Sequence, residues 1–388
     1  MGEDWHDAGF GLYVHWPYCE AKCPYCDFNS HVARWIDHDA WQACYISQLE
    51  HFAKHLPDRK LKSIYFGGGT PSLMKPNTVE AVIATAHRLW GFENQIEITL
   101  EANPSSVEKA KFLDFQLAGV NRVSLGVQAL NDTDLRRLGR VHSASEARSA
   151  IDIAMNVFDR MSFDLIYGRQ DQTLEAWSDE LDAALSIGST HLSLYHLTIE
   201  QGTAFGDRYA IGKLKGLPDD DLSADMFDLT RAKCKDNGFL NYEVSNFAKN
   251  GDLSLHNTLY WSYGDYLGIG PGAHGRLTIN GQKYATDAIL RPDVWLTDSA
   301  AETGKETNMV LLTDQEQAVE MLVMGLRTST GVNKARLDAK SSNILDMTQV
   351  AELVSSNHIT IDQDTIIVTD QGRPLLDHIL NKIIKTNT

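Results

Sequence analysis

Short runs of β-branched and aromatic residues alternate with longer amphipathic segments between residues 11 and 197. Six of these runs are predicted strands, at residues 11–16, 62–66, 95–102, 122–127, 161–168 and 191–197. The intervening segments carry apolar residues at helical spacing, as in 41–56 and 105–119, and the second ends at a glycine, as helices often do. Strands and helices that alternate in this way form βα units around a parallel sheet. The pattern therefore predicts an α/β fold, a partial (β/α)6 TIM-like barrel.

The pattern changes after about residue 300. A helical stretch at 313–328 precedes shorter helical and β-like pieces, and residues 358–372 are typical of a hairpin. We therefore expect a barrel with its following region over residues 1–300 and a small C-terminal α/β domain, winged-helix-like, over residues 301–388.

Composition limits the classes of partner. The 388 residues are 43% hydrophobic and carry a formal net charge of -17, which argues against a broad phosphate-binding surface and so against nucleic acid as a partner. No apolar run is long enough to span a bilayer, and the first ten residues lack the basic and apolar regions of a signal peptide. These features favour a cytoplasmic protein.

Chemically specific residues follow the predicted strands. In parallel barrels the active site forms where strands end and βα loops begin. Any one polar residue there is more often a cap or a solvated loop residue, but six strand ends in register indicate a site. The residues are Tyr13 and His15, the GGGTP segment at 67–71, Glu101, Gln128, Asp164, and His196 with Thr198.

Three of the five cysteines lie within eight residues. Cys19, Cys23 and Cys26 have the spacing C-x3-C-x2-C, too close for an ordinary disulfide framework, and this favours metal-binding thiolates in a reducing compartment. A zinc site would need a fourth ligand, which His15 or His31 could supply. A [4Fe-4S] cluster ordinarily takes four cysteines, so three would leave one iron open to a small molecule. The spacing by itself is compatible with a zinc site and with a [4Fe-4S] cluster. The two remaining cysteines, at 44 and 234, are isolated and are expected to be buried apolar residues.

The cysteine spacing, with Tyr25 just before the last cysteine, resembles the cluster loop of the radical S-adenosylmethionine superfamily. The resemblance implies that S-adenosylmethionine chelates the open iron, and that electron transfer from the cluster breaks a sulfur–carbon bond to give the 5'-deoxyadenosyl radical. The glycines at 67–69 resemble the motif that meets the methionyl ammonium, where a residue without a side chain permits close approach.

A narrower resemblance covers nearly the whole chain. The segments YVHWPYC, FGGGTPS, EANP, RVSLGVQ, LGRVHS, FDLIYG and GRPLLD are similar to the oxygen-independent coproporphyrinogen III oxidase family, HemN and its relatives. The resemblance implies that a first S-adenosylmethionine is held by Tyr13, Gly68, Glu101 and the cluster cysteines, and a second by Tyr25, Gly69, Thr70, Gln128, Arg140 and Asp164. Arg140 suits a carboxylate by bidentate pairing, and Asp164 suits ribose hydroxyls or an ammonium group.

Two departures argue against the oxidase reaction itself. HemN carries a further cysteine two residues after the third, where this chain has Asp27 and Phe28 after Cys26, and HemN has a longer segment before its first strand. Both features match the HemW branch of the family, whose members are regarded as haem chaperones.

The HNTLYW segment at 256–261 resembles the HNxxYW motif associated with haem in that branch. An imidazole such as that of His256 is a common axial ligand of haem iron, and Tyr260 and Trp261 could pack on the flat macrocycle. The alternative is that His256 forms a hydrogen bond in a loop while the aromatics belong to the core. The glycine-rich loop 268–275 is expected beside the cofactor cavity.

Two functions follow from the resemblance. The first is a carrier that binds haem and delivers it to haemoproteins such as respiratory enzymes, with a reductant to serve the cluster and with transient membrane association through those acceptors. The second is a radical enzyme that oxidatively decarboxylates the propionates of coproporphyrinogen III. We expect the carrier.

Overall fold

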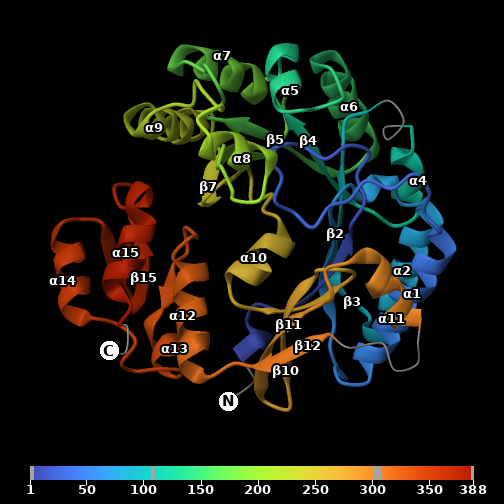
Figure 1. Cartoon of the computed structure of the whole chain (residues 1–388). Helices are drawn as coiled ribbons and strands as arrows, with labels where there is room; N and C mark the ends of the chain where they lie inside the picture. Colours follow the sequence, from blue (N-terminus) through green and yellow to red (C-terminus); the bar gives the residue numbers. More distant parts are fainter. Residues whose placement is uncertain (1–3, 106–109, 301–306, 386–388) are drawn as a thin grey trace.

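The computed structural model describes residues 4–105, 110–300 and 307–385 (Figure 1). Within this part of the chain, no helix is long and apolar enough to cross a membrane. One large sheet and the helices around it account for most of the molecule, and a smaller three-stranded sheet lies toward the C-terminus.

Six parallel strands form the centre of the large sheet and follow one another in chain order. This arrangement confirms the predicted partial barrel, and each strand agrees with its predicted range to within three residues at either end. The strands are β1 (Phe10–Trp16), β2 (Leu61–Gly68), β3 (Phe92–Ala102), β4 (Arg122–Gln128), β5 (Arg160–Tyr167) and β6 (His191–His196).

Helices connect these strands. Several begin at a side chain that accepts a hydrogen bond from a backbone N–H of the first turn, such as Asp37 before α1 and Ser143 before α6. The helix predicted at 41–56 is α1, three residues earlier, and the one predicted at 105–119 is the shorter α4, with residues 106–109 outside the described part. The helices are α1 (His38–Ala53), α2 (Pro76–Trp90), α4 (Phe112–Leu117), α5 (Asp132–Arg137), α6 (Ala144–Val157) and α7 (Leu174–Leu185).

The central strands alternate between polar and apolar residues. Because successive side chains of a strand point to opposite faces, the two sets face opposite sides of the sheet. The apolar set belongs to the main hydrophobic core: Leu12, Val14, Ile64, Phe66, Ile98, Leu100, Val123, Leu125, Phe163, Leu165, Leu192 and Leu194. The polar set faces the inside of the partial barrel: Tyr13, His15, Ser63, Tyr65, Glu97, Thr99, Glu101, Arg122, Ser124, Ser162, Asp164, Ser193 and Tyr195. The inside of this barrel is therefore built to hold polar groups.

Short strands that the sequence patterns did not predict extend the sheet at both edges, with helices between some of them. Beyond β6 come α8 (Ala204–Ala210), α9 (Asp220–Asp236), β7 (Leu240–Glu243) and β8 (Asn246–Ala248). On the other side of β1 lie β9 (Asp265–Ile269), β10 (His274–Ile279), β11 (Gln282–Asp287) and β12 (Asn308–Leu311), with α11 (Pro292–Ala300) between the last two. Strand β12 lies after residue 300 and pairs with β11, so the large sheet continues past that residue. Helix α10 (Leu255–Trp261) lies between β8 and β9 in the sequence and packs on β1, β2 and β9.

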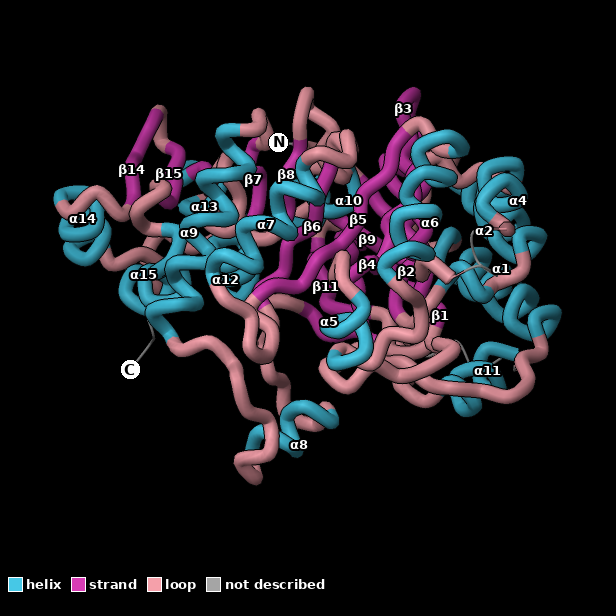
Figure 2. The backbone as a smooth tube through the Cα atoms, turned by 90° about the horizontal axis from the view of Figure 1, so that it is seen from above, coloured by secondary structure: helices cyan, strands magenta, loops and turns pink. Residues whose placement is uncertain are grey.

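The C-terminal unit has its own hydrophobic core. Its hairpin of β14 and β15 lies within the range predicted for one, and its helix α12 lies within the predicted helix 313–328. Figure 2 shows α14, α15 and this hairpin at one end of the molecule, with α1, α2 and α4 at the other. The elements are α12 (Asp314–Gly325), β13 (Val332–Asn333), α13 (Lys334–Asp338), α14 (Met347–Ser355), β14 (Ile359–Asp362), β15 (Thr365–Val368) and α15 (Leu376–Ile383).

Candidate functional site

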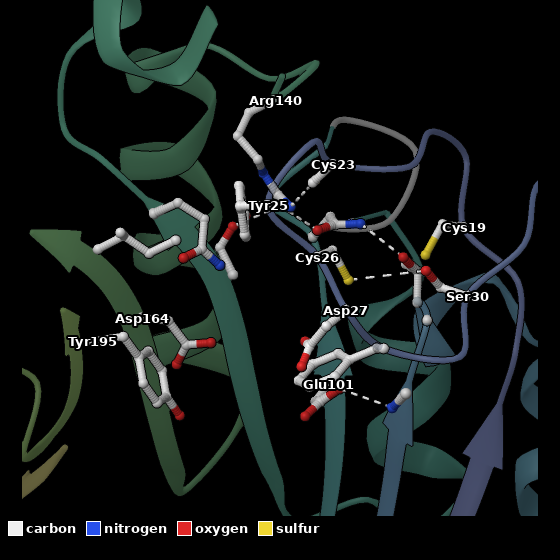
Figure 3. Close-up of a pocket in the computed structure, with 18 of the residues that line it drawn as sticks. Cys19, Cys23, Tyr25, Cys26, Asp27, Ser30, Glu101, Arg140, Asp164 and Tyr195 are labelled. Atoms are coloured by element: carbon white, nitrogen blue, oxygen red, sulfur yellow. Dashed lines mark hydrogen bonds between the residues drawn. The ribbon is translucent and has the colours of Figure 1, made fainter. Parts of the chain in front are cut away.

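The loop after β1 brings three free thiols to the wall of a cavity of ≈ 310 Å³ at the ends of the central strands (Figure 3). Two backbone hydrogen bonds fix the loop: Cys19 donates to the carbonyl of His31 at 2.9 Å, and Cys26 to that of Cys23 at 3.1 Å. All three cysteines are half-buried, whereas Cys44 lies in the core. Cys234 is buried as well, so both isolated cysteines are core residues, as predicted.

The donor set fits an iron–sulfur centre. Burial raises the pKa of Cys19 and of Cys26, so these thiols would release their protons when a metal binds. A guanidinium N–H of Arg140 donates to Sγ of Cys23 at 3.3 Å, which favours negative charge on that sulfur. Three cysteine thiols beside a cavity leave one side of a four-iron cluster free for another ligand.

Of the two histidines considered for a zinc site, His15 is already engaged on both ring nitrogens. Both ring nitrogens of His15 already have partners, the hydroxyl of Tyr13 at 3.0 Å and the carbonyl of Asn29 at 3.0 Å. Nε2 of His31 lies 3.0 Å from Oδ1 of the same asparagine. Among the described residues, no group of three or more His, Cys, Asp or Glu side chains gathers around a position for a single metal ion.

The glycine turn after β2 brings backbone close to the cavity. Gly68 has φ 108°, a conformation that side chains disfavour, and a Cβ there would lie 2.5 Å from the His15 ring. A Cβ at Gly69 would lie 2.7 Å from the carbonyl oxygen of Tyr18. Thr70 follows, buried on the same cavity, and its N–H donates to that carbonyl at 2.8 Å. The N–H groups of Gly68, Gly69 and Thr70 all donate within the protein, and the two glycines let a ligand approach this backbone without interference from side chains.

Glu101 lies next to this turn. Its Oε2 accepts the N–H of Gly68 at 3.2 Å, and its Oε1 accepts the hydroxyl of Tyr65 at 2.8 Å. Burial, reinforced by Asp164, raises the pKa of Glu101 to about 7. A buried carboxyl with a pKa near neutrality would ionise readily beside a positive group, such as the ammonium of an amino acid.

Asp164 lies within β5, and Gln128 is the last residue of β4. Burial raises the pKa of Asp164 to about 6, and Ser124 donates to its Oδ1 at 3.4 Å. Figure 3 shows Asp164 beside Tyr195, across the cavity from the cysteines. Gln128 adopts φ 71° at the end of β4 and lines the same cavity. Neither Ser124 nor Tyr195 was predicted as a site residue, although their polar positions within apolar strands were a usable signal.

The guanidinium group of Arg140 donates hydrogen bonds to several protein acceptors. Besides Cys23, it donates to the carbonyl of Gly126 at 2.8 Å and to the side chain of Asn103, which in turn donates to Thr70 at 3.1 Å. Tyr25 lies next to Arg140, and burial raises the pKa of its phenol. These contacts hold the cysteine loop against β3 and β4, while Nε of Arg140, on the cavity wall, has no partner among the described residues. Asn103 belongs to this network and was not predicted.

A larger cavity of ≈ 1050 Å³ adjoins the first. Tyr13 lines this cavity rather than the smaller one, as do Tyr260, Trp261 and, from the C-terminal unit, Arg327. The two cavities share six lining residues, Asp27, Phe28, Ser30, Gly68, Glu101 and Tyr195. A molecule in one cavity would therefore lie next to a molecule in the other.

His256 is on the wall of the larger cavity, near the start of α10. Its Nδ1 lies 2.9 Å from Oγ of Ser63, and its ring stacks on Tyr65 with centroids 4.9 Å apart. The backbone N–H of His256 donates to Oε1 of Glu97 at 3.0 Å. Burial lowers the pKa of the imidazole to about 4, so it is neutral at pH 7. The alternative to the axial-ligand prediction placed His256 in a loop, whereas the structure places it on a helix that contacts β2 and β3.

Comparison with known proteins defines the class. Residues 13–184 match the model of the Radical SAM superfamily, and residues 312–375 match the HemN C-terminal domain. The solved structure of coproporphyrinogen III oxidase (HemN) from Escherichia coli superposes with a TM-score of 0.79, covering 96% of this chain and 89% of that one, at 22% identity, which establishes the shared fold.

Two curated relatives narrow the assignment. The heme chaperone HemW of Escherichia coli (strain K12) is 34% identical, with 95% of this chain and 96% of the relative covered. The mitochondrial radical S-adenosyl methionine domain-containing protein 1 of Bos taurus is 37% identical, with 96% and 87% covered. The chain belongs to the HemW-like family of radical S-adenosylmethionine proteins.

Proposed function

We propose that this protein is a haem chaperone that binds haem in the larger cavity and delivers it to acceptor haemoproteins. The observation that carries the proposal is the position of α10: His256, Tyr260 and Trp261 all line a cavity of ≈ 1050 Å³ that adjoins the cysteine cavity. That volume is just above the usual range for small-molecule sites, about 300–1,000 Å³, and suits a large macrocycle. Relatives that bear the name heme chaperone support the same role.

The smaller cavity is proposed to hold the other cofactors. Cys19, Cys23 and Cys26 would hold a [4Fe-4S] cluster, and Gly68 and Glu101 would orient the amino group of S-adenosylmethionine. When bound, this pair supplies one-electron chemistry.

A second molecule would lie on the side of the smaller cavity formed by Gln128 and Asp164. The family resemblance adds Tyr25, Gly69 and Thr70 to that group, and all three line the cavity. Arg140, which the resemblance assigns to a ligand carboxylate, also lines this cavity and supports Cys23.

The proposed partners follow from this role. They are haem, haemoproteins such as respiratory enzymes, and an electron donor for the cluster, with the protein acting in the cytoplasm and meeting membranes through its acceptors.

Haem titration tests the proposal. His256→Ala should weaken binding, read from the Soret band, and slow transfer to an apo-haemoprotein, while iron content stays unchanged. His378→Ala, an exposed histidine on α15, is the matched control and should bind haem normally. Unaltered affinity and spectrum in His256→Ala would refute this axial ligand, and His274, exposed on the same cavity, would be examined next.

The competing function needs its own experiment. Reconstituted protein is incubated without oxygen with coproporphyrinogen III, S-adenosylmethionine and reductant. A chaperone yields no protoporphyrinogen at catalytic turnover, and sustained turnover would establish the oxidase instead.

A further inference from the structure

Ser63 contacts the proposed haem ligand from a distant part of the chain. It lies on β2, fully buried, and its Oγ is 2.9 Å from Nδ1 of His256 on α10, 193 residues further along the chain. Space for this contact depends on Gly11 of β1, because a Cβ there would lie 2.9 Å from the same Oγ. Strands β1 and β2 and helix α10 therefore pack together around the hydrogen bond between Ser63 and His256.

The contact decides which ring nitrogen meets the cavity. Tyr65 stacks on the imidazole of His256 at an interplanar angle of 25°, which fixes the plane of the ring but does not distinguish its two nitrogens. Ser63 makes that distinction by holding Nδ1. No partner for Nε2 is found among the described residues, and the side chain lines the larger cavity.

We propose that Ser63 is a positioning residue for haem ligation: it accepts the Nδ1–H of His256 and so directs the Nε2 lone pair into the larger cavity. This inference rests on the proposed haem role of His256. Metal-bound histidines commonly donate their second ring N–H to a neighbouring oxygen, which fixes the tautomer and the ring orientation. A serine hydroxyl performs that role here.

The test compares Ser63→Ala with the unmodified full-length protein, both reconstituted with iron and titrated with haem. Loss of such a partner costs about 10- to 100-fold in metal affinity, and we expect a loss in this range. The iron–histidine stretching frequency in resonance Raman spectra should shift as well, because it depends on the hydrogen bond at Nδ1, and a general packing defect would not produce that shift. Ser189→Ala removes another buried serine hydroxyl away from the cavity and should change neither quantity.

His256→Ala, measured in parallel, separates the two proposals. If His256→Ala loses haem while Ser63→Ala keeps the normal affinity and frequency, the role of Ser63 is wrong and the ligand assignment stands. If neither variant differs from the unmodified protein, the ligand assignment itself is wrong. Should Ser63→Ala lower the melting temperature, Ser63→Thr decides, because it keeps a hydroxyl: normal haem affinity supports the inference, and an affinity as weak as that of Ser63→Ala contradicts it.

Discussion

The Tyr65 hydroxyl donates a hydrogen bond to Oε1 of Glu101 at 2.8 Å. Glu101 borders both cavities, and the Tyr65 ring stacks on His256 at 4.9 Å on the wall of the larger one. One tyrosine therefore touches the carboxylate proposed for S-adenosylmethionine and the imidazole proposed for haem. Its two contacts are separable, since one uses the hydroxyl and the other uses the ring.

Tyr65→Phe removes only the hydroxyl. Glu101 then keeps the N–H of Gly68 as a donor, and with less stabilisation of its charge its pKa should rise above about 7. A larger protonated fraction at neutral pH should weaken the binding of S-adenosylmethionine by about 5- to 10-fold. The response of the reduced cluster in electron paramagnetic resonance measures this affinity. Tyr284→Phe, which removes a hydroxyl outside the two cavities, is the control, and equal affinities in the two variants would contradict the prediction.

Glu101 should also give the cluster-free protein a pH-dependent stability. Its pKa is raised from 4.5 to about 7 in the folded state, so the folded protein holds this proton more tightly than the unfolded chain does. Stability should then fall as pH rises between those two values. Glu101→Gln cannot ionise and should not show this loss. The difference between its free energy of unfolding and that of the unmodified protein should therefore increase in favour of the variant, by up to about 3 kcal/mol, as pH rises from 4.5 to about 7. Urea denaturation at several pH values tests this, and a pH-independent difference would contradict it.

Substitution of the three loop cysteines should lower the iron content of the protein, whereas substitution of the other two cysteines should not. Anaerobically purified protein should contain about four irons per chain, and Cys19→Ala, Cys23→Ala or Cys26→Ala should each abolish the centre. Cys44→Ala and Cys234→Ala change buried core residues and should keep the iron, at a cost to stability on the order of 1 kcal/mol. Stoichiometric zinc without iron in such preparations would refute the cluster.

The barrel and the cysteine loop were predictable because their signals are local. Strands β1 to β6 alternate with helices, and the cysteines are adjacent in sequence. Strands β7 to β12 are three to six residues long, too short for a clear period. The HNTLYW segment was recognised as a site but not as a helix. The groups that hold it, Glu97 and Ser63, lie more than 150 residues earlier, and no local pattern reports such a contact.

Two glycines with positive φ should respond very differently to substitution. Gly68→Ala adds a Cβ 2.5 Å from the His15 ring at φ 108°, whereas Gly202→Ala adds one at φ 79° with nothing within 4 Å. The second change carries only the backbone cost, about 1 kcal/mol, and the first adds a steric clash that brings the loss to about 3 kcal/mol or more. Thermal unfolding of the two variants measures the difference. Similar melting temperatures would show that the turn at Gly68 can relax.

Glu97 anchors the proposed haem helix to the barrel. Its carboxylate is fully buried and accepts the N–H of Leu255 at 3.0 Å and of His256 at 3.0 Å, while Arg160 donates to it at 2.8 Å. Although burial opposes ionisation, Arg122 and Arg160 together with these N–H groups hold the pKa of Glu97 below its ordinary value. The carboxylate is therefore charged and links β4 and β5 to α10.

Glu97→Gln should cost about 3–5 kcal/mol, because it leaves buried arginine charge without its counterion. Glu50→Gln is the matched control, since Glu50 pairs with Arg88 at the surface at 2.8 Å, and such pairs contribute about 1 kcal/mol or less. Denaturant unfolding measures both values. In conditions where Glu97→Gln remains folded, haem affinity should fall more than the response to S-adenosylmethionine, because among the described residues Glu97 bonds to the backbone of His256, whereas Glu101 and Gly68 bond to each other. Equal losses of both would indicate that the barrel as a whole, and not α10, depends on this carboxylate.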